Sequence, residues 1–444
     1  MDKAWNEMTP DQRLAQRLDD YVNMPGFEFS SPEAEALYRE RTTNIRDAFE
    51  LKTPARVPVF PSEGFFPVLH AGLTMRDALY EYEKVAQALL AYIDEFQPDA
   101  WFGPLAITPG PCFDVLDYKL YDWPGHGLPD EVMYQMIEGE YVVAEEYAQL
   151  SADPTDFFLR KYLPRVFGAL EPLRQLPLIP SIQEMPMTPN ALISFGTPDV
   201  QEALKKLMQA GNEAMRWADT IGPLGAQVRA LGVADWAGGA AKAPFDAIGD
   251  TLRGTKGMMV DMYRHPDELI EACERFVPLM VDMGLSGVTQ TGVPLVFMPL
   301  HKGADGFMSN AQFEKFYWPT LKAVMLGLVE QGCIPVMFAE GSYNQRLEII
   351  ADFPKGKCIW WFDQSDMQRV ADVMRDVACI AGNVSTAMMA AGTPEEVKAY
   401  CKHLIETVGK DGGFILTNGC GIDHAKAENV KAMMEAGREY GVYA

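Results

Sequence analysis

The run GVPLVFMPL at residues 292–300, which His301 follows, decides the fold of the C-terminal half of the chain. The run is apolar almost throughout, with no alternation of polar residues, and similar short runs recur near residues 333–338, 357–362, 378–383 and 413–418. A helix-like segment follows each run. Strands joined by helices are parallel, and strands buried on both faces are apolar throughout. The pattern therefore predicts an α/β fold, either an open doubly wound sheet or a (β/α)8 barrel.

Polar or metal-competent residues stand at or just past the ends of these runs. They are His301, Glu340, Asp363, Asn383 and Cys420. In a (β/α)8 barrel the C-terminal strand ends and the loops after them build the active site. This gathering favours the barrel over the open sheet. For Asp363 and Asn383 the alternative is an ordinary role, in which they begin βα loops and cap helices.

The remainder of the chain divides into an N-terminal extension and the barrel. Residues 1–55 are charged and helix-like, with Ser31 as an N-cap, and residues 56–444 are assigned to the barrel. Further strands are expected at residues 56–60 and 100–107. Two stretches are interpreted as loops, a loop-rich insertion around 109–130 (PGPCFDVLDYKLYDWPGHGLPD) and the small-residue stretch 233–249 (VADWAGGAAKAPFDAIG). Thr393 opens a helix with a capping box, and Asn310 is a candidate cap for another.

Charge and composition exclude several classes of protein. The 444 residues contain 38 Lys and Arg against 62 Asp and Glu, a net charge of −24, which is too acidic for a broad nucleic-acid-binding surface. No apolar run is long enough to span a bilayer, and the first residues lack the apolar core of a signal peptide. The seven cysteines are scattered and form no CxxC pair. We therefore expect no nucleic-acid partner, no membrane association and a reducing, cytoplasmic location.

Three of the strand-end residues form a candidate metal site. His301, Glu340 and Cys420 offer an imidazole, a carboxylate and a thiolate, which together can hold zinc and leave one coordination position open for catalysis. The glycines around Cys420, in Asn418-Gly419-Cys420-Gly421, leave room for a metal close to the backbone. Glu340 also counts as a catalytic candidate, and further candidates at the rim of the same pocket are Asp305, Asp363 and Asn383. The chain contains no P-loop, no GxGxxG between a strand and a helix, and no GxSxG elbow.

Several short motifs in the last 150 residues follow one another in a specific order. They are Gly306-Phe307-Met308-Ser309, Phe313 to Pro319 (FEKFYWP), Ala381-Gly382-Asn383-Val384, Gly392 to Val397 (GTPEEV), Gly412 to Leu416 (GGFIL) and Cys420-Gly421-Ile422. In order and spacing this set resembles the uroporphyrinogen decarboxylase superfamily. The resemblance implies a (β/α)8 TIM barrel, here with a mostly helical N-terminal extension and long loops over the C-terminal barrel face.

The resemblance covers two chemistries. Uroporphyrinogen decarboxylases are metal-free and carry an arginine-containing segment after the first strand, where this chain reads PSEGFFPVLHAGL with no arginine before Arg76. The other branch consists of zinc-dependent, corrinoid-linked methyltransferases. Their coenzyme M-type members use an HxC pair and a later cysteine. Cys420 matches the later cysteine, whereas the HxC position reads Phe338-Ala339-Glu340, so the resemblance implies Glu340 as a ligand in place of Cys, with His301 supplying the nitrogen.

This altered pattern resembles the methyltransferase component of systems that demethylate aryl methyl ethers. It implies Zn²⁺, a small methoxylated aromatic substrate and a corrinoid (cobalamin) carried by a partner protein, because the chain has no DxHxxG-type cobalamin loop. A homodimer is compatible with the sequence, which does not fix the oligomeric state. Three other functions stay open: methylcorrinoid:thiol transfer of the coenzyme M type, a metal-free decarboxylase with an Asp-centred site, and a non-catalytic binding barrel.

Overall fold

Eight parallel strands form a ring in the computed structural model, which describes residues 4–104 and 107–443. In chain order they are the extended segment 57–60, β1 (Ala100–Trp101), the stretch that contains β5 (Ala234–Asp235) and β6 (Gly239–Ala240), β7 (Leu295–Leu300), β8 (Ile334–Ala339), β9 (Ile359–Phe362), β10 (Cys379–Val384) and β11 (Phe414–Asn418). The strands β6 to β11 make one parallel sheet, and β1 pairs with β5. Val59 closes the ring through a parallel bridge to Leu416 of β11, while its carbonyl accepts a hydrogen bond from Asp99 N at 3.1 Å. The (β/α)8 barrel is confirmed, and the open sheet is excluded.

The stretch 234–240 is a barrel strand, where the sequence pattern predicts a loop. Trp236 N donates to Trp101 O at 3.0 Å on one side, and Gly238 N donates to Leu295 O at 2.8 Å on the other. The chain crosses between these neighbours at two glycines, where a Cβ would stand 2.0 Å from Val293 O at Gly238 and 2.2 Å from Gly284 O at Gly239. Close contacts with neighbouring backbone therefore require small residues here, and a sequence of small residues does not indicate a strand.

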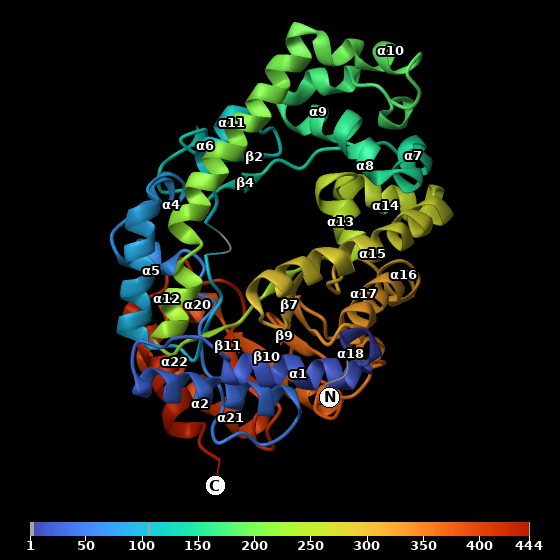
Figure 1. Ribbon diagram of the computed structural model, residues 1–444. Coiled ribbons are helices and arrows are strands. Elements are labelled where there is room, and N and C mark those ends of the chain that lie inside the picture. Colours follow the sequence, from blue (N-terminus) through green and yellow to red (C-terminus); the bar gives the residue numbers. More distant parts are fainter. Residues whose placement is uncertain (1–3, 105–106, 444) are drawn as a thin grey trace.

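Helices surround the ring (Figure 1). They are α3 (Phe66–His70), α4 (Met75–Tyr80), α5 (Tyr82–Phe96), α12 (Leu224–Ala230), α13 (Pro244–Thr251), α14 (Gly254–Arg264), α15 (Pro266–Thr291), α16 (Asn310–Gln312), α17 (Trp318–Glu330), α18 (Leu347–Ile350), α19 (Met367–Met374), α20 (Thr386–Ala391), α21 (Pro394–Thr407) and α22 (Ala427–Tyr440). Ser309, rather than Asn310, caps α16 through a capping box with Gln312. Among the described residues, no helix combines the length and the apolarity that a bilayer-spanning segment needs.

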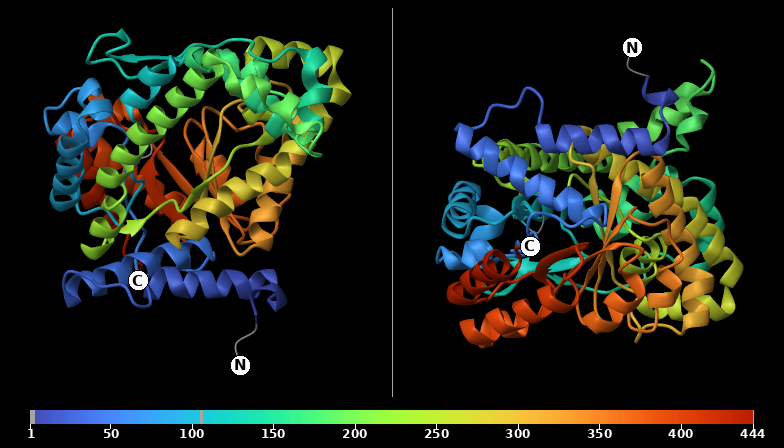
Figure 2. Two further views of the ribbon diagram at one scale, coloured as in Figure 1. Left: turned by 45° about the horizontal axis from the view of Figure 1, so that its top comes forward. Right: turned by 90° about the horizontal axis from the view of Figure 1, so that it is seen from below.

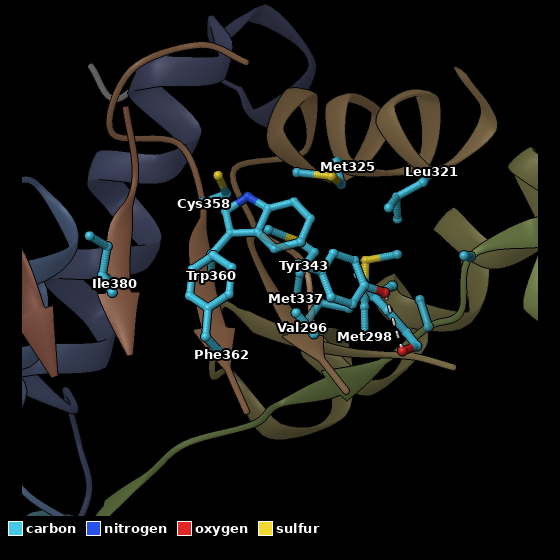
Figure 3. Packing of buried hydrophobic residues seen from close by; sticks show 14 of the residues in the cluster. Val296, Met298, Leu321, Met325, Met337, Tyr343, Cys358, Trp360, Phe362 and Ile380 are labelled. Atoms are coloured by element: carbon cyan, nitrogen blue, oxygen red, sulfur yellow. Dashed lines mark hydrogen bonds between the residues drawn. The ribbon is translucent and has the colours of Figure 1, made fainter. Parts of the chain in front are cut away.

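Side chains along each strand alternate between the two faces of the barrel. Val296 and Met298 of β7 and Met337 of β8 point outward and pack against α17 (Figure 3). The residues between them, such as Phe297 and Phe338, point into the barrel and share a second cluster with side chains of the N-terminal helices. This alternation fixes which strand-end residues face the barrel mouth.

The N-terminal helices α1 (Pro10–Asn23) and α2 (Pro32–Phe49) cover the end of the barrel at which the strands begin (Figure 2). Arg17 Nε donates to Gln331 O at 3.1 Å, and Arg41 Nη1 donates to Gly232 O at 2.7 Å. Both carbonyls lie just before barrel strands. Ser31 caps α2, as the sequence predicts. This end of the barrel is therefore closed, and the opposite end carries the site.

The long connection between β1 and α12 arches over the C-terminal strand ends (Figure 1). It contains α6 (Gly110–Leu116), α7 (Tyr147–Ala152), α8 (Pro154–Phe157), α9 (Leu163–Val166), α10 (Thr188–Leu192), α11 (Pro198–Ile221) and a small sheet of β2 (Tyr121–Pro124), β3 (Gly127–Leu128) and β4 (Gln135–Met136). The stretch 109–130 thus holds a helix and strands where a loop was expected, because glycines and prolines show where the chain turns but not what pairs between the turns. Tyr147 Oη donates to Asp261 at 2.7 Å and fixes the arch to α14.

Replacing Thr393 by alanine is expected to lower the free energy of unfolding by about 1 kcal/mol. The Thr393 hydroxyl accepts a hydrogen bond from Glu396 N at 3.3 Å, and the Glu396 carboxylate accepts one from Thr393 N at 2.8 Å, so the predicted capping box of α21 is confirmed. Denaturant unfolding measures the loss. Thr393→Ser, which keeps the hydroxyl, serves as the control, and equal losses in the two variants would contradict the capping role.

Candidate metal centre

Four neighbouring strands bring polar residues to one level at the barrel mouth. Leu300 pairs with Ala339, and Ala339 pairs with Phe362, so His301, Glu340 and Asp363 follow at adjacent positions. Ala381 pairs with Trp361, which places Asn383 beside Asp363. Each of the four comes two positions after a residue that points into the barrel. Because side chains along a strand alternate between its two faces, all four lie on the inner side as well. The structure thus gathers four of the strand-end residues that the sequence singles out.

A layer of aromatic rings lies directly below these residues. Phe338 and Trp361 have ring centroids 4.5 Å apart, Phe297 lies 6.0 Å from Phe338, and Phe102 lies 4.7 Å from Phe297. Phe338 occupies the position of the histidine in the HxC pattern. Its ring belongs to this apolar layer and offers no metal ligand. The layer fills the barrel beneath the site, so a small molecule reaches the polar residues from the mouth alone.

His301 stands between two carboxylates. Its Nδ1 lies 2.7 Å from Asp250 Oδ2, and its Nε2 lies 3.7 Å from Glu340 Oε1. In the neutral tautomer that donates Nδ1–H to Asp250, the lone pair is on Nε2 and faces Glu340. Burial lowers the pKa of His301, but the hydrogen bond and charge of Asp250, with the charges of Glu340 and Asp246, raise it above its ordinary value overall. A carboxylate behind the second ring nitrogen is the usual companion of a metal-bound histidine.

Two carboxylates of α13 hold this arrangement, and neither is among the candidates predicted from the sequence. Asp246 Oδ2 accepts from His301 N at 3.0 Å and from Tyr317 Oη at 2.6 Å. Asp250 lies 2.6 Å from the Nζ atoms of both Lys242 and Lys302. Although burial raises the pKa of Asp250, His301 and the two lysines hold it below its usual range. A spacing of four residues places Asp246 and Asp250 on one face of a helix, but the helix itself is concealed in the stretch read as a loop.

Glu340 and Cys420 share one electrostatic environment. Burial raises the pKa of Glu340, with His301 opposing and the charges of Asp246, Asp250 and Asp363 adding to the rise. Burial, together with the charges of Glu340 and then Asp363, raises the pKa of the Cys420 thiol to about 11. Without a cation the thiol is therefore protonated at neutral pH. A cation at this place would relieve the repulsion among these groups and favour the thiolate.

The remaining candidates bind loop backbone. Asp363 Oδ2 accepts from Gly341 N at 3.0 Å, and Asn383 Nδ2 donates to Asp363 O at 3.0 Å while Tyr400 Oη donates to Asn383 Oδ1 at 2.7 Å. These contacts fix the loops that follow β8, β9 and β10. Asp305 lies apart from the His301 group. It accepts from Ser342 Oγ at 2.8 Å and from Gln345 N at 3.2 Å, and so it links the loops after β7 and β8.

The donor set and its surroundings fit zinc. His301, Glu340 and Cys420 supply nitrogen, oxygen and sulfur, and Asp250 orients the histidine as the second shell of a zinc site does. Within residues 4–104 and 107–443, no three His, Cys, Asp or Glu side chains already stand at the spacing of a bound ion. Of the three donors, His301 and Glu340 lie closest together, with Nε2 3.7 Å from Oε1, and the side chains of Glu340 and Cys420 are each partly exposed.

Glu63 is a buried carboxyl group at the mouth that is also absent from the candidates predicted from the sequence. It follows the first strand, is 1% exposed, and accepts hydrogen bonds from Phe102 N at 3.0 Å and from Gly103 N at 3.1 Å. Burial raises its pKa to about 7, although these backbone hydrogen bonds lower it. No motif marks this residue, because its role depends on contact with the chain after the second strand.

Stability should fall as the pH rises through the range in which Glu63 ionises. The unfolded carboxyl has a pKa of about 4.3, so between that pH and about 7 the folded state holds a proton that the unfolded state has lost. In Glu63→Gln this loss is absent. The unfolding free energy of the variant relative to wild type should therefore increase by about 3 kcal/mol between pH 4 and pH 8. Denaturant unfolding at pH 4, 6 and 8 measures this, and a difference independent of pH would contradict it.

The comparisons with known proteins bear on the family and the fold. The sequence profile of the uroporphyrinogen decarboxylase (URO-D) family matches residues 198–440, more than half of the 444 residues. The chain belongs to the uroporphyrinogen decarboxylase family. The match begins with α11 and includes β5 to β11, and so it contains His301, Glu340 and Cys420. Family and fold together support an enzyme of this superfamily.

A solved structure shows the same fold. A methyltransferase from Methanosarcina mazei superposes with a TM-score of 0.58 at 16% identity, covering 91% of this chain and 98% of that one. A B12-independent methionine synthase from Shewanella sp. W3-18-1 aligns over 45% of this chain and 60% of its own, with 12% identity and a TM-score of 0.32, which is too low to carry an argument. No curated protein sequence matches the chain.

Proposed function

We propose that the protein is a zinc-dependent methyltransferase that moves a methyl group from a methoxylated aromatic compound to the Co(I) corrinoid of a partner protein. One observation carries the proposal. His301 Nδ1 lies 2.7 Å from Asp250, and its Nε2 faces Glu340 at 3.7 Å. At the same end of the barrel, the charge of Glu340 also acts on the thiol of Cys420. The shared fold of the Methanosarcina mazei methyltransferase supports this reading.

The residues of this site suit an oxygen leaving group. Zinc held by His301, Glu340 and Cys420 would supply a Lewis acid for the ether oxygen. Asp250 keeps the imidazole of His301 in one orientation and one tautomer. The carboxylate of Glu340 is a harder donor than the cysteine that thiol-methylating relatives carry at this place. The ligand set therefore favours activation of an ether over activation of a thiol.

The rest of the mouth directs the substrate. The aromatic layer of Phe297, Phe338 and Trp361 closes the barrel below, so the methyl group of a bound ether is reached from the side of the arch. In the overall reaction the ether oxygen gives up its methyl group and gains a proton, and the corrinoid of the partner accepts the methyl group. Co(I) and a cysteine ligand both need a reducing environment, so we place the protein in the cytoplasm.

A decarboxylase acting on a polycarboxylate is less consistent with the charges. Such a substrate needs cationic side chains in its site. In the described part of the chain, the cavity beside His301 is lined by two lysines and no arginine. Lys242 and Lys302 both pair with Asp250. The positive charges of these two lysines are therefore already paired with a carboxylate of the protein.

A methyl-transfer assay tests the proposal. Zinc-loaded protein is incubated with Co(I) cobalamin, as a stand-in for the corrinoid partner, and with 2-methoxyphenol. We expect methylcobalamin and the demethylated phenol in equal amounts, followed by absorbance and chromatography. Absence of both products with a panel of methoxyarenes would contradict the proposal. Methylation of a thiol from methylcobalamin in the parallel assay would instead assign the protein to the thiol branch.

A further inference from the structure

A cavity of about 220 Å³ lies in the arch, beside the barrel mouth. Its walls come from α4, α6 and β2 and from the segments that flank them. Five aromatic side chains line it together with Leu79: they are Phe113, Tyr118, Tyr121, Trp123 and Tyr134. An apolar cavity of about 150 Å³ is sufficient for benzene. This cavity therefore has room for one substituted aromatic ring.

The aromatic rings contact one another around the cavity. Phe113 stacks on Tyr118 at 5.4 Å and meets Trp123 edge-on at 6.0 Å. Tyr121 lies 5.6 Å from Tyr118 and meets Tyr134 edge-on at 5.9 Å. Both ring faces and ring edges are thus available to a guest. An arrangement of this kind favours a flat aromatic guest over an aliphatic one.

Three hydroxyl groups around the cavity have no protein partner. Within residues 4–104 and 107–443, the Oη atoms of Tyr118, Tyr121 and Tyr134 make no hydrogen bond. By contrast, the Trp123 indole donates to Tyr80 Oη at 3.0 Å, and Tyr80 donates to Asp114 at 2.9 Å. Burial raises the pKa of all three unpartnered tyrosines, which keeps them protonated as donors. They can bind a polar substituent on a guest ring.

The cavity suits a neutral guest. The side chains that line it include no acidic or basic residue among those described. Tyr121 also lines the adjoining cavity at His301, where Lys242 and Lys302 are already paired with Asp250. A carboxylate on the guest would lose its water without gaining a free cation, which is costly. A phenolic hydroxyl loses less and gains the tyrosine partners.

We propose that this cavity binds an uncharged, single-ring phenol and selects hydroxylated methoxybenzenes over methoxybenzoates. The inference rests on the proposed function, and it names the substrate class of the same mouth. Because Tyr121 lines both cavities, a ring held here lies beside the His301 site. The hydroxyl groups of Tyr121 and Tyr134 then act as specificity determinants.

Calorimetric titration of the full-length protein tests this without any corrinoid. The probes are 2-methoxyphenol, 2-methoxybenzoate and 2-methoxycyclohexanol, which differ in charge and in aromaticity. We expect 2-methoxyphenol to bind at least ten-fold more tightly than the other two. Tyr121→Phe and Tyr134→Phe keep the rings, and each should weaken binding about five-fold, the loss of one hydrogen bond. Tyr263→Phe, at a 75% exposed tyrosine on α14, should leave binding unchanged.

The outcomes separate this inference from the proposed function. Equal binding of the benzoate or the cyclohexanol, no binding at all, or unchanged affinity in both cavity variants would overturn the inference. Methyl transfer that persists in that case would leave the proposed function standing. Selective binding of the phenol without methyl transfer would support the cavity and count against the function.

Discussion

Replacing Asp250 by asparagine is expected to destabilise the fold by about 3–5 kcal/mol, since it leaves the buried Lys302 cation without its anion. The Asp250 side chain is 6% exposed and lies 2.6 Å from Lys242 and Lys302 and 2.7 Å from His301. The same change removes the carboxylate that orients His301. Zinc affinity should therefore fall about 10–100-fold as well. Denaturant unfolding and competition with a zinc chelator measure the two effects.

The matched control for this change is Asp352→Asn. Asp352 pairs with Lys322 at 2.7 Å, but its side chain is 79% exposed, so the expected loss of stability is below about 1 kcal/mol. If Asp250→Asn were as stable as this control and bound zinc as tightly as wild type, Asp250 would not have the positioning role described here.

Replacing Glu340 by glutamine should abolish methyl transfer while the fold persists. Glu340 faces His301 Nε2 at 3.7 Å, and the neutral amide is a much poorer metal ligand of nearly the same shape. We expect the rate to fall at least about 100-fold, more than the loss of an outer-shell partner costs. Stability should stay equal or rise slightly, because burial and the neighbouring carboxylates raise the pKa of Glu340 and so disfavour its charge in the folded state.

Methyl transfer to Co(I) cobalamin and thermal unfolding, measured on the same preparations, check this prediction. Glu314→Gln, at an exposed residue just before α17, is the control and should keep wild-type activity. An active Glu340→Gln variant would exclude Glu340 as a ligand. An unfolded one would show that Glu340 has a structural role that its partial exposure does not indicate.

The sequence predicts the ring of strands where the strands are apolar. The strands β7, β8, β9 and β11 end one or two residues before His301, Glu340, Asp363 and Cys420, and Asn383 is the penultimate residue of β10. Because parallel strands end at the same edge and alternate strictly, the end of a strand also fixes which side chains face the mouth. That is why His301, Glu340 and Asp363 could be grouped across gaps of more than twenty residues.

The sequence does not predict contacts that depend on backbone proximity. Gly238 and Gly239 belong to a barrel strand, yet small residues carry no strand signal. Only the structure shows that glycine is needed at both positions, because a Cβ would collide with Val293 O at Gly238 and with Gly284 O at Gly239. The misread stretch also concealed α13 and, with it, Asp246 and Asp250. Asp305 also comes after a strand, but it lies in an irregular loop, and a hydrophobic pattern does not predict the path of such a loop.

The arch was predicted least well. Its aromatic residues are visible in the sequence, but Tyr121 and Tyr134 meet only because β2 and β4 pair as antiparallel strands, with Tyr121 opposite Met136. Turn residues show where such strands end and not which strands pair. The cavity proposed for the phenol ring is therefore a property of the structure alone.

The metal content of the freshly purified protein is the most direct test of the zinc site. Wild type is compared with Cys420→Ala and Glu340→Ala by elemental analysis, before and after reconstitution with zinc. We expect close to one zinc per chain in wild type and a clear loss in both variants, with the fold retained. Wild-type protein that holds no zinc even after reconstitution would contradict the zinc site of His301, Glu340 and Cys420, and with it the proposed reaction.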